Sequence, residues 1–364
     1  MKVKLVIAGG GTGGHLFPGI AVADELLSRY PGSEVLFISP GREIDRLALA
    51  EKPYRQAVLT GGGLKGVSWR RRLSALARIP LGFGQALSLL REFRPDLVLG
   101  VGGYVTGPVL IAARLLRITA CIHEQNSVPG LANRLLGPLV DHIFLSLPIS
   151  GNYFPAAKTS LVGNPLRREL LAAAALPARP EAGRKPPRLL VLGGSQGARR
   201  INLLMVEAAR KLAADGVDFE LSHQTGQQDR GSTEEGYRRA GVRARVEAFI
   251  PDMAAEYLAV DLVISRAGAT TLAELALFGK AALLIPYPFA TDDHQRLNAE
   301  IMVRRGAARL LTEDGLSADE LAEQIKALLH NEADRQMMGI KARKLSRPDA
   351  AATIIDESLA AKRK

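Results

Sequence analysis

The 364-residue sequence contains a single cysteine, Cys121, which excludes an internal disulfide framework and any zinc cluster built from several cysteines. A chain so poor in cysteine is typical of a reducing compartment such as the cytoplasm. Long apolar runs are also missing, because none reaches the roughly 18 residues that a membrane-spanning helix requires. The N-terminal apolar segment is too short for the core of a signal peptide and runs into glycines. Any membrane contact is therefore expected to be peripheral.

Acidic residues are fewer than basic ones, 37 against 48, so the formal net charge is +11. A basic protein tends to meet phosphate groups, nucleic acid or an anionic membrane surface, and charge alone does not choose among them. Hydrophobic residues make up 47% and charged residues 23%, an ordinary globular balance. Because a chain of this length usually exceeds one core, two domains are expected.

Short apolar segments alternate with helical patterns along the chain, and continuous apolar strands of this kind are typical of parallel sheets covered on both faces. The stretch 176–187 has four prolines and no periodicity, so it is expected at the surface near a domain boundary. The predicted class is α/β, with two Rossmann-like, doubly wound domains and a cleft between them. The predicted strands are 4–8, 34–39, 96–101, 120–123, 142–146, 160–162, 188–192, 219–222, 245–249, 261–265 and 281–285. The expected helices include 19–29, 201–214, 270–278 and most of the chain from 318 onward.

Three glycine-rich loops follow predicted strands: Gly9–His15 (GGGTGGH), Gly100–Pro108 and Gly193–Gly197. Glycine adopts positive φ without strain, and the helix that follows presents unpaired N–H groups to an anion. Ligands of doubly wound sheets lie beyond the carboxyl ends of the strands, where all three loops fall. Glycines that serve only tight turns are a weaker explanation for three loops than for one. The loops therefore predict phosphate binding.

Gly9, Gly11 and Gly14 also match the dinucleotide fingerprint G-x-G-x-x-G. That use requires an acidic residue at the end of the second strand to hold a ribose, and no acid stands there. Arg42 follows the strand instead, and an arginine at this place is able to meet a 2′-phosphate. An NADP-dependent oxidoreductase therefore stays open as an alternative.

Seven motifs follow one another in order: GGGTGGHLFPGIAVA at Gly9–Ala23, GVGGYVTGP at Gly100–Pro108, HEQN at His123–Asn126, GNPLR at Gly163–Arg167, GGSQGA at Gly193–Ala198, RAGATTLAEL at Arg266–Leu275 and DDHQRLNA at Asp292–Ala299. Together they resemble the bacterial peptidoglycan N-acetylglucosaminyltransferase family, MurG. The resemblance implies the GT-B fold and an inverting, metal-independent transfer of GlcNAc from UDP-GlcNAc to undecaprenyl-pyrophosphoryl-MurNAc-pentapeptide (lipid I), which gives lipid II for peptidoglycan. It implies no cofactor and a peripheral location on the cytoplasmic face of the inner cell membrane.

The same resemblance divides the chain by task. Residues 1–165 are expected to bind the acceptor and the membrane, residues 166–345 to bind UDP-GlcNAc, and the segment 346–364 to pack back on the first domain. Contacts with other cell-wall synthesis or division proteins fit this place in the cell. A rival in the same class is a UDP-sugar transferase that makes glycolipids from diacylglycerol.

The donor contacts implied by the resemblance are Thr12, Gly13, Gly14, Asn126, Arg167, Ser195, Ile250, Ala269, Thr270, Thr271, Leu272, Ala273, Glu274 and Gln295. The helix expected over 270–278 begins just after Gly268, so its N-terminus is able to face the diphosphate. Glu274 is expected to accept hydrogen bonds from the ribose hydroxyls; otherwise it is a first-turn acid that favours the helix dipole. Ser195 either binds a phosphate oxygen or caps a helix, and the backbone of Ile250 is expected to read uracil.

His15 is the candidate general base, because inverting transfer needs the acceptor hydroxyl to lose its proton as it attacks the anomeric carbon. At a helix N-terminus the dipole disfavours the imidazolium, which leaves the neutral form that a base requires. The alternative is that His15 only orients the acceptor pyrophosphate or caps the turn. Since most donor motifs lie in the second half, the Gly9–His15 loop is expected to receive this pyrophosphate. Gly11, Thr12, Gly103 and Tyr104 are expected to help bind it.

Two acidic or histidine clusters suggest a metal but have the wrong spacing. Asp292-Asp293-His294 lacks the D-x-D pattern of metal-dependent sugar transferases. His123-Glu124 does not complete H-E-x-x-H, because position 127 is a serine. No residue is therefore assigned to a metal.

The segment 65–94 is basic, with seven Lys or Arg and one acid, and apolar residues are interleaved with the charges. Cations rimming apolar side chains suit an anionic membrane, whereas nucleic acid prefers more stacking aromatics than this segment offers. No nucleic-acid partner is therefore expected. Pro80 and two glycines are expected to break any long helix here. The predicted membrane contacts are Trp69, Arg70, Arg71, Arg72, Leu76, Ile79 and Phe83.

Overall fold

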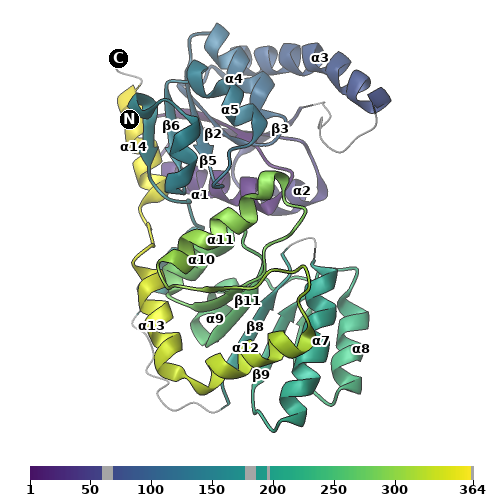
Figure 1. The fold of residues 1–364 in the computed structure, drawn as a ribbon. Helices are drawn as coiled ribbons and strands as arrows, with labels where there is room; N and C mark the ends of the chain where they lie inside the picture. Colours follow the sequence, from purple (N-terminus) through teal and green to yellow (C-terminus); the bar gives the residue numbers. More distant parts are fainter. Residues whose placement is uncertain (60–68, 177–185, 195–196, 362–364) are drawn as a thin grey trace. The chain divides into compact units, whose positions relative to one another are not determined.

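The computed structural model describes residues 1–59, 69–176, 186–194 and 197–361, without the side chains of residues 69–79. Its contacts divide the chain into two domains, and each has its own parallel sheet (Figure 1). The first domain comprises Met1–Arg168 and Arg347–Lys364, and the second comprises Glu169–Ser346.

The first domain contains a seven-stranded parallel sheet in the order β3-β2-β1-β4-β5-β6-β7. The strand order reverses at β1, so the carboxyl ends of β1 and β4 lie side by side at the point where such folds bind ligands. The strands are β1 Lys4–Gly9, β2 Glu34–Ser39, β3 Arg55–Val58, β4 Leu97–Gly102, β5 Thr119–Glu124, β6 His142–Leu145 and β7 Thr159–Leu161.

Helices cover both faces of this sheet. Alternate β1 residues point to opposite faces, so Leu5 and Ile7 belong to one core and Val6 and Ala8 to the other. The helices are α1 Gly13–Arg29, α2 Glu43–Leu49, α3 Trp69–Phe93, α4 Thr106–Leu115, α5 Leu131–Leu136 and α14 Ala350–Ala361, with short 3-10 turns at Gly137–Leu139, Pro148–Tyr153 and Ala156–Lys158.

The C-terminal helix α14 belongs to the first domain and packs beside α1 (Figure 1). Ile354 and Ile355 are buried in the core that α1 shares with β1. At the surface, the Arg29 guanidinium donates to Asp356 at 2.9 Å. Residues near both ends of the sequence thus complete one core.

Helix α3 runs through Pro80, so the expectation of a broken helix is wrong. Proline removes one hydrogen bond and crowds the preceding turn, at a cost of about 3 kcal/mol. The residues that follow are held by burial, because Ala86, Leu90 and Phe93 lie in the core. Burying Leu90 and Phe93 contributes roughly 1.5–3 kcal/mol each, which together is enough to offset the proline.

The second domain contains a six-stranded parallel sheet in the order β10-β9-β8-β11-β12-β13. Its winding reverses at β8, so the loops after β8 and β11 are neighbours. The strands are β8 Arg188–Leu192, β9 Glu220–Gln224, β10 Ala244–Glu247, β11 Leu262–Ser265, β12 Ala281–Leu284 and β13 Arg309–Leu310.

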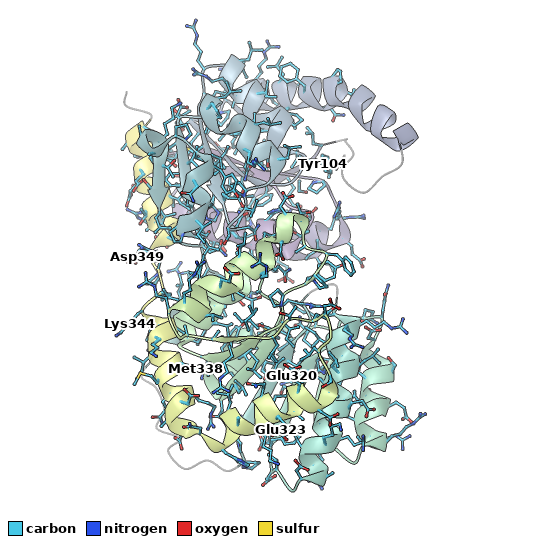
Figure 2. All side chains as sticks on the ribbon, viewed as in Figure 1. Tyr104, Glu320, Glu323, Met338, Lys344 and Asp349 are labelled. Carbon is cyan, nitrogen blue, oxygen red and sulfur yellow. The ribbon has the colours of Figure 1, made fainter. Side chains whose placement is uncertain are left out.

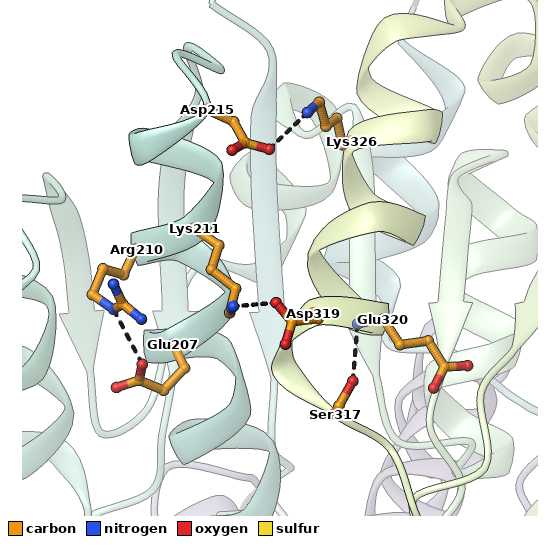
Figure 3. Close-up of polar contacts among 8 residues, drawn as sticks. All are labelled: Glu207, Arg210, Lys211, Asp215, Ser317, Asp319, Glu320 and Lys326. Carbon is orange, nitrogen blue, oxygen red and sulfur yellow. Dashed lines mark hydrogen bonds and ion pairs between the residues drawn. The ribbon is translucent and has the colours of Figure 1, made fainter.

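The helices of this domain are α7 Arg199–Ala214, α8 Arg230–Arg239, α9 Met253–Ala259, α10 Ala269–Phe278, α11 His294–Arg304, α12 Ala318–His330 and α13 Glu332–Arg343, with α6 Arg168–Ala175 leading in from the first domain and a 3-10 turn at Thr291–Asp293. Met338 of α13 (Figure 2) lies in the same core as the inward face of α7. Helices α7 and α12 are further joined by Asp215–Lys326 at 2.7 Å and by Lys211–Asp319 (Figure 3). These pairs are exposed, so apolar packing is the main contact.

Candidate active site

The Gly9–Gly11 turn follows β1 and lies against the end of β4. Gly9, Gly10 and Gly11 have φ values of +158°, +128° and +81°. A Cβ at Gly9 would stand 2.4 Å from a Val101 methyl and 2.7 Å from the Gly102 carbonyl oxygen, so only glycine allows this approach. The two loops of the first sheet therefore meet backbone to backbone at the switch point.

Helix α1 begins immediately after this turn, with Thr12 as its N-cap residue. The Thr12 hydroxyl does not cap the helix. It lies 3.4 Å from Nδ1 of the half-buried His15. If Nδ1–H donates to Thr12, Nε2 keeps the lone pair that a general base needs. A Cβ at Gly102 would come within 2.9 Å of His15 Nε2, so the ring rests on the second glycine loop.

The HEQN segment forms a buried polar layer in the first domain. Nε2 of Gln125 donates to the Val101 carbonyl oxygen at 2.9 Å and contacts His123 Nδ1 at 3.1 Å. His123 Nε2 lies 3.2 Å from the Gly163 carbonyl oxygen. Burial lowers the pKa of His123 to about 4, so the ring is neutral. This layer links the second glycine loop to the GNPLR segment.

Asn126 is held in its turn by the buried carboxylate of Glu124. Glu124 accepts from the N–H groups of Asn126 at 2.9 Å and Gly130 at 3.1 Å, and from the Asn133 amide at 2.8 Å. Burial raises the pKa of Glu124, although these donors favour its charged form. Glu124 thus positions a predicted donor contact rather than a metal.

The two arginines of the GNPLR region have different surroundings. The Arg167 guanidinium lies over the Phe17 ring of α1, 4.8 Å from its centroid. Arg168 donates to the Ser28 hydroxyl at 3.1 Å at the surface. Arg167 is therefore stacked on the helix that carries His15.

In the second domain, the loop after β8 and the end of β9 are packed together. The Gly193 N–H donates to the Gln224 carbonyl oxygen at 3.1 Å, and a Cβ at Gly197 would stand 2.4 Å from the Thr225 carbonyl oxygen. The Gln224 side chain accepts from the Ile250 N–H at 3.0 Å. The Ile250 N–H is thus already engaged, and its side chain is buried.

A buried hydrogen-bond chain supports the same region. The His223 ring lies 2.8 Å from the Tyr237 hydroxyl through Nδ1 and 3.0 Å from Asn202 Oδ1 through Nε2. Asn202 in turn donates to the Thr225 carbonyl oxygen at 3.1 Å and to Asp229 at 2.9 Å. Burial lowers the pKa of His223 to about 3. The chain fixes the end of β9 with a neutral histidine.

Helix α10 begins at Ala269, one residue earlier than expected, and has no acid in its first turn. Glu274 is in the second turn, where the helix dipole has faded, so the interpretation as a first-turn acid is wrong. Its carboxylate is 8% exposed and accepts from the Tyr257 hydroxyl at 2.9 Å. Ala269 and Leu272 are buried, whereas Thr270, Thr271 and Ala273 are partly exposed.

Gln295 lies in the first turn of α11, after the loop that follows β12. Its Oε1 accepts from the Tyr287 N–H at 3.0 Å. Asp292 and Asp293, just before it, both have left-handed φ values, 53° and 52°. Left-handed conformations of non-glycine residues are uncommon and are found at ligand sites more often than elsewhere. The orientation of Gln295 is thus set by an unusual turn.

Comparison with known proteins assigns the family. The model of the glycosyltransferase family 28 N-terminal domain matches residues 5–145, and that of the C-terminal domain matches residues 188–354. A Geobacter sulfurreducens protein is 48% identical over 362 residues, with 100% of both chains covered; it is named UDP-N-acetylglucosamine--N-acetylmuramyl-(pentapeptide) pyrophosphoryl-undecaprenol N-acetylglucosamine transferase. A Desulfotalea psychrophila protein of the same name is 47% identical, with 97% of this chain and 95% of its own covered.

The crystal structure of Acinetobacter baumannii MurG has 31% sequence identity and a TM-score of 0.79, covering 98% of this chain and 99% of its own. The chain belongs to the MurG family. The family prediction is confirmed, as are the GT-B fold and the assignment as a glycosyltransferase. Arg42, the residue on which the NADP alternative depended, donates to the Gly11 carbonyl oxygen at 3.1 Å.

Within each domain of the present chain, the predicted residues lie at the carboxyl ends of the strands. The first domain carries Thr12, Gly13, Gly14, His15, Gly103, Tyr104, Asn126 and Arg167 there, and the second carries Ile250, Ala269–Glu274 and Gln295. Ser195 lies outside the described residues. Gly11 differs from expectation, because its N–H already donates to Asp45 at 2.6 Å and is not available to a phosphate in this conformation.

Three residues that contact or adjoin the predicted site residues were not found from the sequence. Thr106 receives the Gly102 N–H at 3.2 Å and donates to the Ala8 carbonyl oxygen at 3.0 Å, so it ties β4 to β1. Phe249 exposes 52% of its surface directly before Ile250. Asp45, six residues beyond the end of β2, holds the glycine turn. The place of Phe249 next to a predicted donor contact was a usable signal, whereas the partners of Thr106 and Asp45 depend on tertiary contacts.

The predicted membrane contacts of this MurG-family chain fall mostly outside the described side chains. Trp69, Arg70, Arg71, Arg72, Leu76 and Ile79 are in the first part of α3, where only the backbone is described. Phe83 packs against the first-domain core. Among the described residues, no helix is long and apolar enough to cross a bilayer.

Proposed function

We propose that this chain transfers GlcNAc from UDP-GlcNAc to undecaprenyl-pyrophosphoryl-MurNAc-pentapeptide, converting lipid I to lipid II. The observation that carries this is the arrangement of α10, whose first turn holds no acidic residue and which places a buried carboxylate one turn further on. A helix N-terminus attracts a diphosphate, and a carboxylate accepts hydrogen bonds from ribose hydroxyls. The name shared by whole-length relatives supplies the sugar and the acceptor.

In the proposed reaction the two domains have separate tasks. The second domain binds the donor through the start of α10, Glu274, Gln295 and the Ile250 carbonyl. The first domain receives the acceptor diphosphate at the N-terminus of α1, so the proposal gives Thr12, Gly13 and Gly14 to the acceptor and not to the donor. Asn126 and Arg167 keep the donor role expected for the HEQN and GNPLR segments. His15 removes the proton of the acceptor hydroxyl as its oxygen attacks the anomeric carbon, UDP departs, and the configuration is inverted. No metal takes part in this scheme.

The direct test is release of UDP from UDP-GlcNAc with and without a lipid I analogue. We expect release that depends on the analogue and gives a disaccharide-bearing lipid by mass spectrometry. The same assay with diacylglycerol is the control for a glycolipid-forming enzyme. Release that needs diacylglycerol, or that ignores the analogue, would contradict the proposed acceptor.

We further propose that the enzyme sits peripherally on the cytoplasmic face of the membrane. Support comes from an apolar–basic face, defined by Ile111, Arg114 and Leu115 on α4 with Leu131, Arg134 and Leu135 on α5. Leu115 is 63% and Leu135 is 68% exposed, although leucine is normally buried. The two helices that carry these side chains are in contact with each other. Cations beside exposed apolar residues suit an anionic lipid surface.

Replacing Leu115 and Leu135 together with serine is expected to weaken binding to anionic vesicles by about tenfold or more, because each leucine loses its apolar burial in lipid. Co-sedimentation with vesicles containing phosphatidylglycerol measures this. The matched control replaces Met337 and Ile340, exposed apolar residues of α13 in the second domain, with serine. Equal losses in both double variants, or none in the first, would count against the α4–α5 face.

A further inference from the structure

Asp45 of α2 holds the Gly9–Gly11 turn in place, a task that the proposed reaction does not assign to any residue. Asp45 is 1% exposed. Its Oδ1 accepts the Gly11 N–H at 2.6 Å, and its Oδ2 accepts the Arg42 N–H at 3.0 Å. Only a carboxylate accepts at both oxygens, because an asparagine amide would turn one of them into a donor. The charged side chain is therefore required for this pair of contacts.

Arg42 completes the arrangement from the other side. Its guanidinium donates to the Gly11 carbonyl oxygen at 3.1 Å, so both backbone groups of Gly11 are bound by side chains or backbone of one short segment. The N–H groups left for an anion are then those at the start of α1, at Gly13 and Gly14, which no preceding turn satisfies. Asp45 and Arg42 thus decide which donors of the loop face a ligand.

The glycines of both loops fit around this carboxylate. A Cβ at Gly10 would stand 2.8 Å from Asp45 Oδ1, and a Cβ at Gly103 would stand 3.2 Å from the Gly10 carbonyl oxygen. Burial raises the pKa of Tyr104. Tyr104 also lies close enough to Arg42 and Asp45 for their charges to act on it, since Arg42 lowers its pKa and Asp45 raises it. We call Asp45 and Arg42, with their three contacts to Gly11 and to each other, the Asp45–Arg42 clamp. The clamp therefore fixes the positions of both glycine loops.

A carboxylate beside a phosphate-binding turn is unexpected, because its negative charge repels an anionic acceptor. Here its charge is met by two backbone N–H groups, one of them that of Gly11, and the Arg42 guanidinium binds the carbonyl of the same glycine. Asp45 binds two backbone N–H groups with its two carboxylate oxygens. We propose that Asp45, supported by Arg42, is a positioning residue that sets the Gly9–Gly14 turn for the acceptor diphosphate. The inference rests on the proposed function, in which this turn receives the acceptor.

The test is Asp45→Asn, assayed with a lipid I analogue and UDP-GlcNAc varied separately. We expect the acceptor kcat/KM to fall about 10- to 100-fold, the range for one lost charge-assisted contact, with the KM for UDP-GlcNAc changed less than about twofold. Amide hydrogen exchange at Gly11 should become faster. Arg42→Ala, which changes an exposed side chain, should give a smaller loss in the same direction. Glu43→Gln is the matched control, because it removes an exposed acid of α2 that has no contact with the turn in the described structure.

A second variant separates this inference from the proposed function. A Cβ at Gly14 meets nothing within 4 Å, so Gly14→Ala should fold and place a methyl group where the diphosphate is proposed to dock. An acceptor defect in Gly14→Ala without one in Asp45→Asn or Arg42→Ala would overturn the positioning role and leave the acceptor site intact. No acceptor defect in Gly14→Ala would overturn both. If Asp45→Asn impaired the kinetics with UDP-GlcNAc as much as those with the acceptor, Asp45 would have only a general structural role and the inference would be overturned.

Discussion

Replacing His15 with alanine is expected to lower kcat by about 10²- to 10⁴-fold, the usual contribution of a general base. The imidazole is half-buried, rests on Gly102 and lies near the Thr12 hydroxyl, so its Nε2 is held in one place. Binding of UDP-GlcNAc should change little, because the main donor residues belong to the second domain. Steady-state rates and calorimetric titration with UDP-GlcNAc check the two halves of this expectation.

His15→Gln distinguishes a base from a group that only orients the acceptor. Glutamine keeps a hydrogen-bonding side chain but cannot take a proton at neutral pH. If His15 is the general base, the glutamine variant should be as slow as the alanine variant. The acidic limb of the profile of kcat/KM against pH should also disappear. Recovery of near-normal turnover with glutamine would assign His15 to orientation.

The second large effect is expected at Glu274. Replacing this buried carboxylate with glutamine should raise the KM for UDP-GlcNAc about 10- to 100-fold, because hydrogen bonds from the ribose to a charged acceptor are each worth about 1.5–3 kcal/mol. The acceptor KM should stay nearly constant. A donor series that includes UDP and the 2′-deoxy and 3′-deoxy nucleotides locates the lost contacts.

Tyr257→Phe is the control for the Glu274 experiment. It removes the hydroxyl that donates to Glu274 and leaves the carboxylate in place. If Glu274 acts on the ribose, the phenylalanine variant should lose only a few-fold in donor affinity. A loss as large as that of Glu274→Gln would indicate that the carboxylate serves the packing of α9 against α10 instead.

Much of the sheet architecture was predictable because the central strands are continuous apolar runs. The segments predicted at 34–39 and 188–192 coincide with β2 and β8. Strand β3 was missed, because it lies at a sheet edge, is mostly exposed and has no apolar pattern. Strand β13 was missed because two residues are too short for periodicity. Helix α3 was misjudged because proline was weighed as a local signal, whereas burial of the following turns decides.

The site was predictable where a motif is contiguous and unpredictable where contacts join distant segments. The glycine loops and the RAGATTLAEL helix stand at the expected strand ends. The clamp at Gly11 was not foreseeable, since Asp45 comes 34 residues later and its partner is a backbone N–H. Gln224 and Ile250 are likewise joined only by folding, over 26 residues. Sequence patterns identify the groups able to bind a ligand, but not those already used by the protein itself.

The position of α14 has a consequence for synthesis of the chain. The core on one face of the first sheet contains Ala351, Ile354 and Ile355, which are translated after the whole second domain. Domains generally fold as units as they emerge from the ribosome, N-terminal ones first. Here all core residues of the second domain are translated before α14, whereas the core that α1 shares with β1 is complete only once Ile354 and Ile355 have been added.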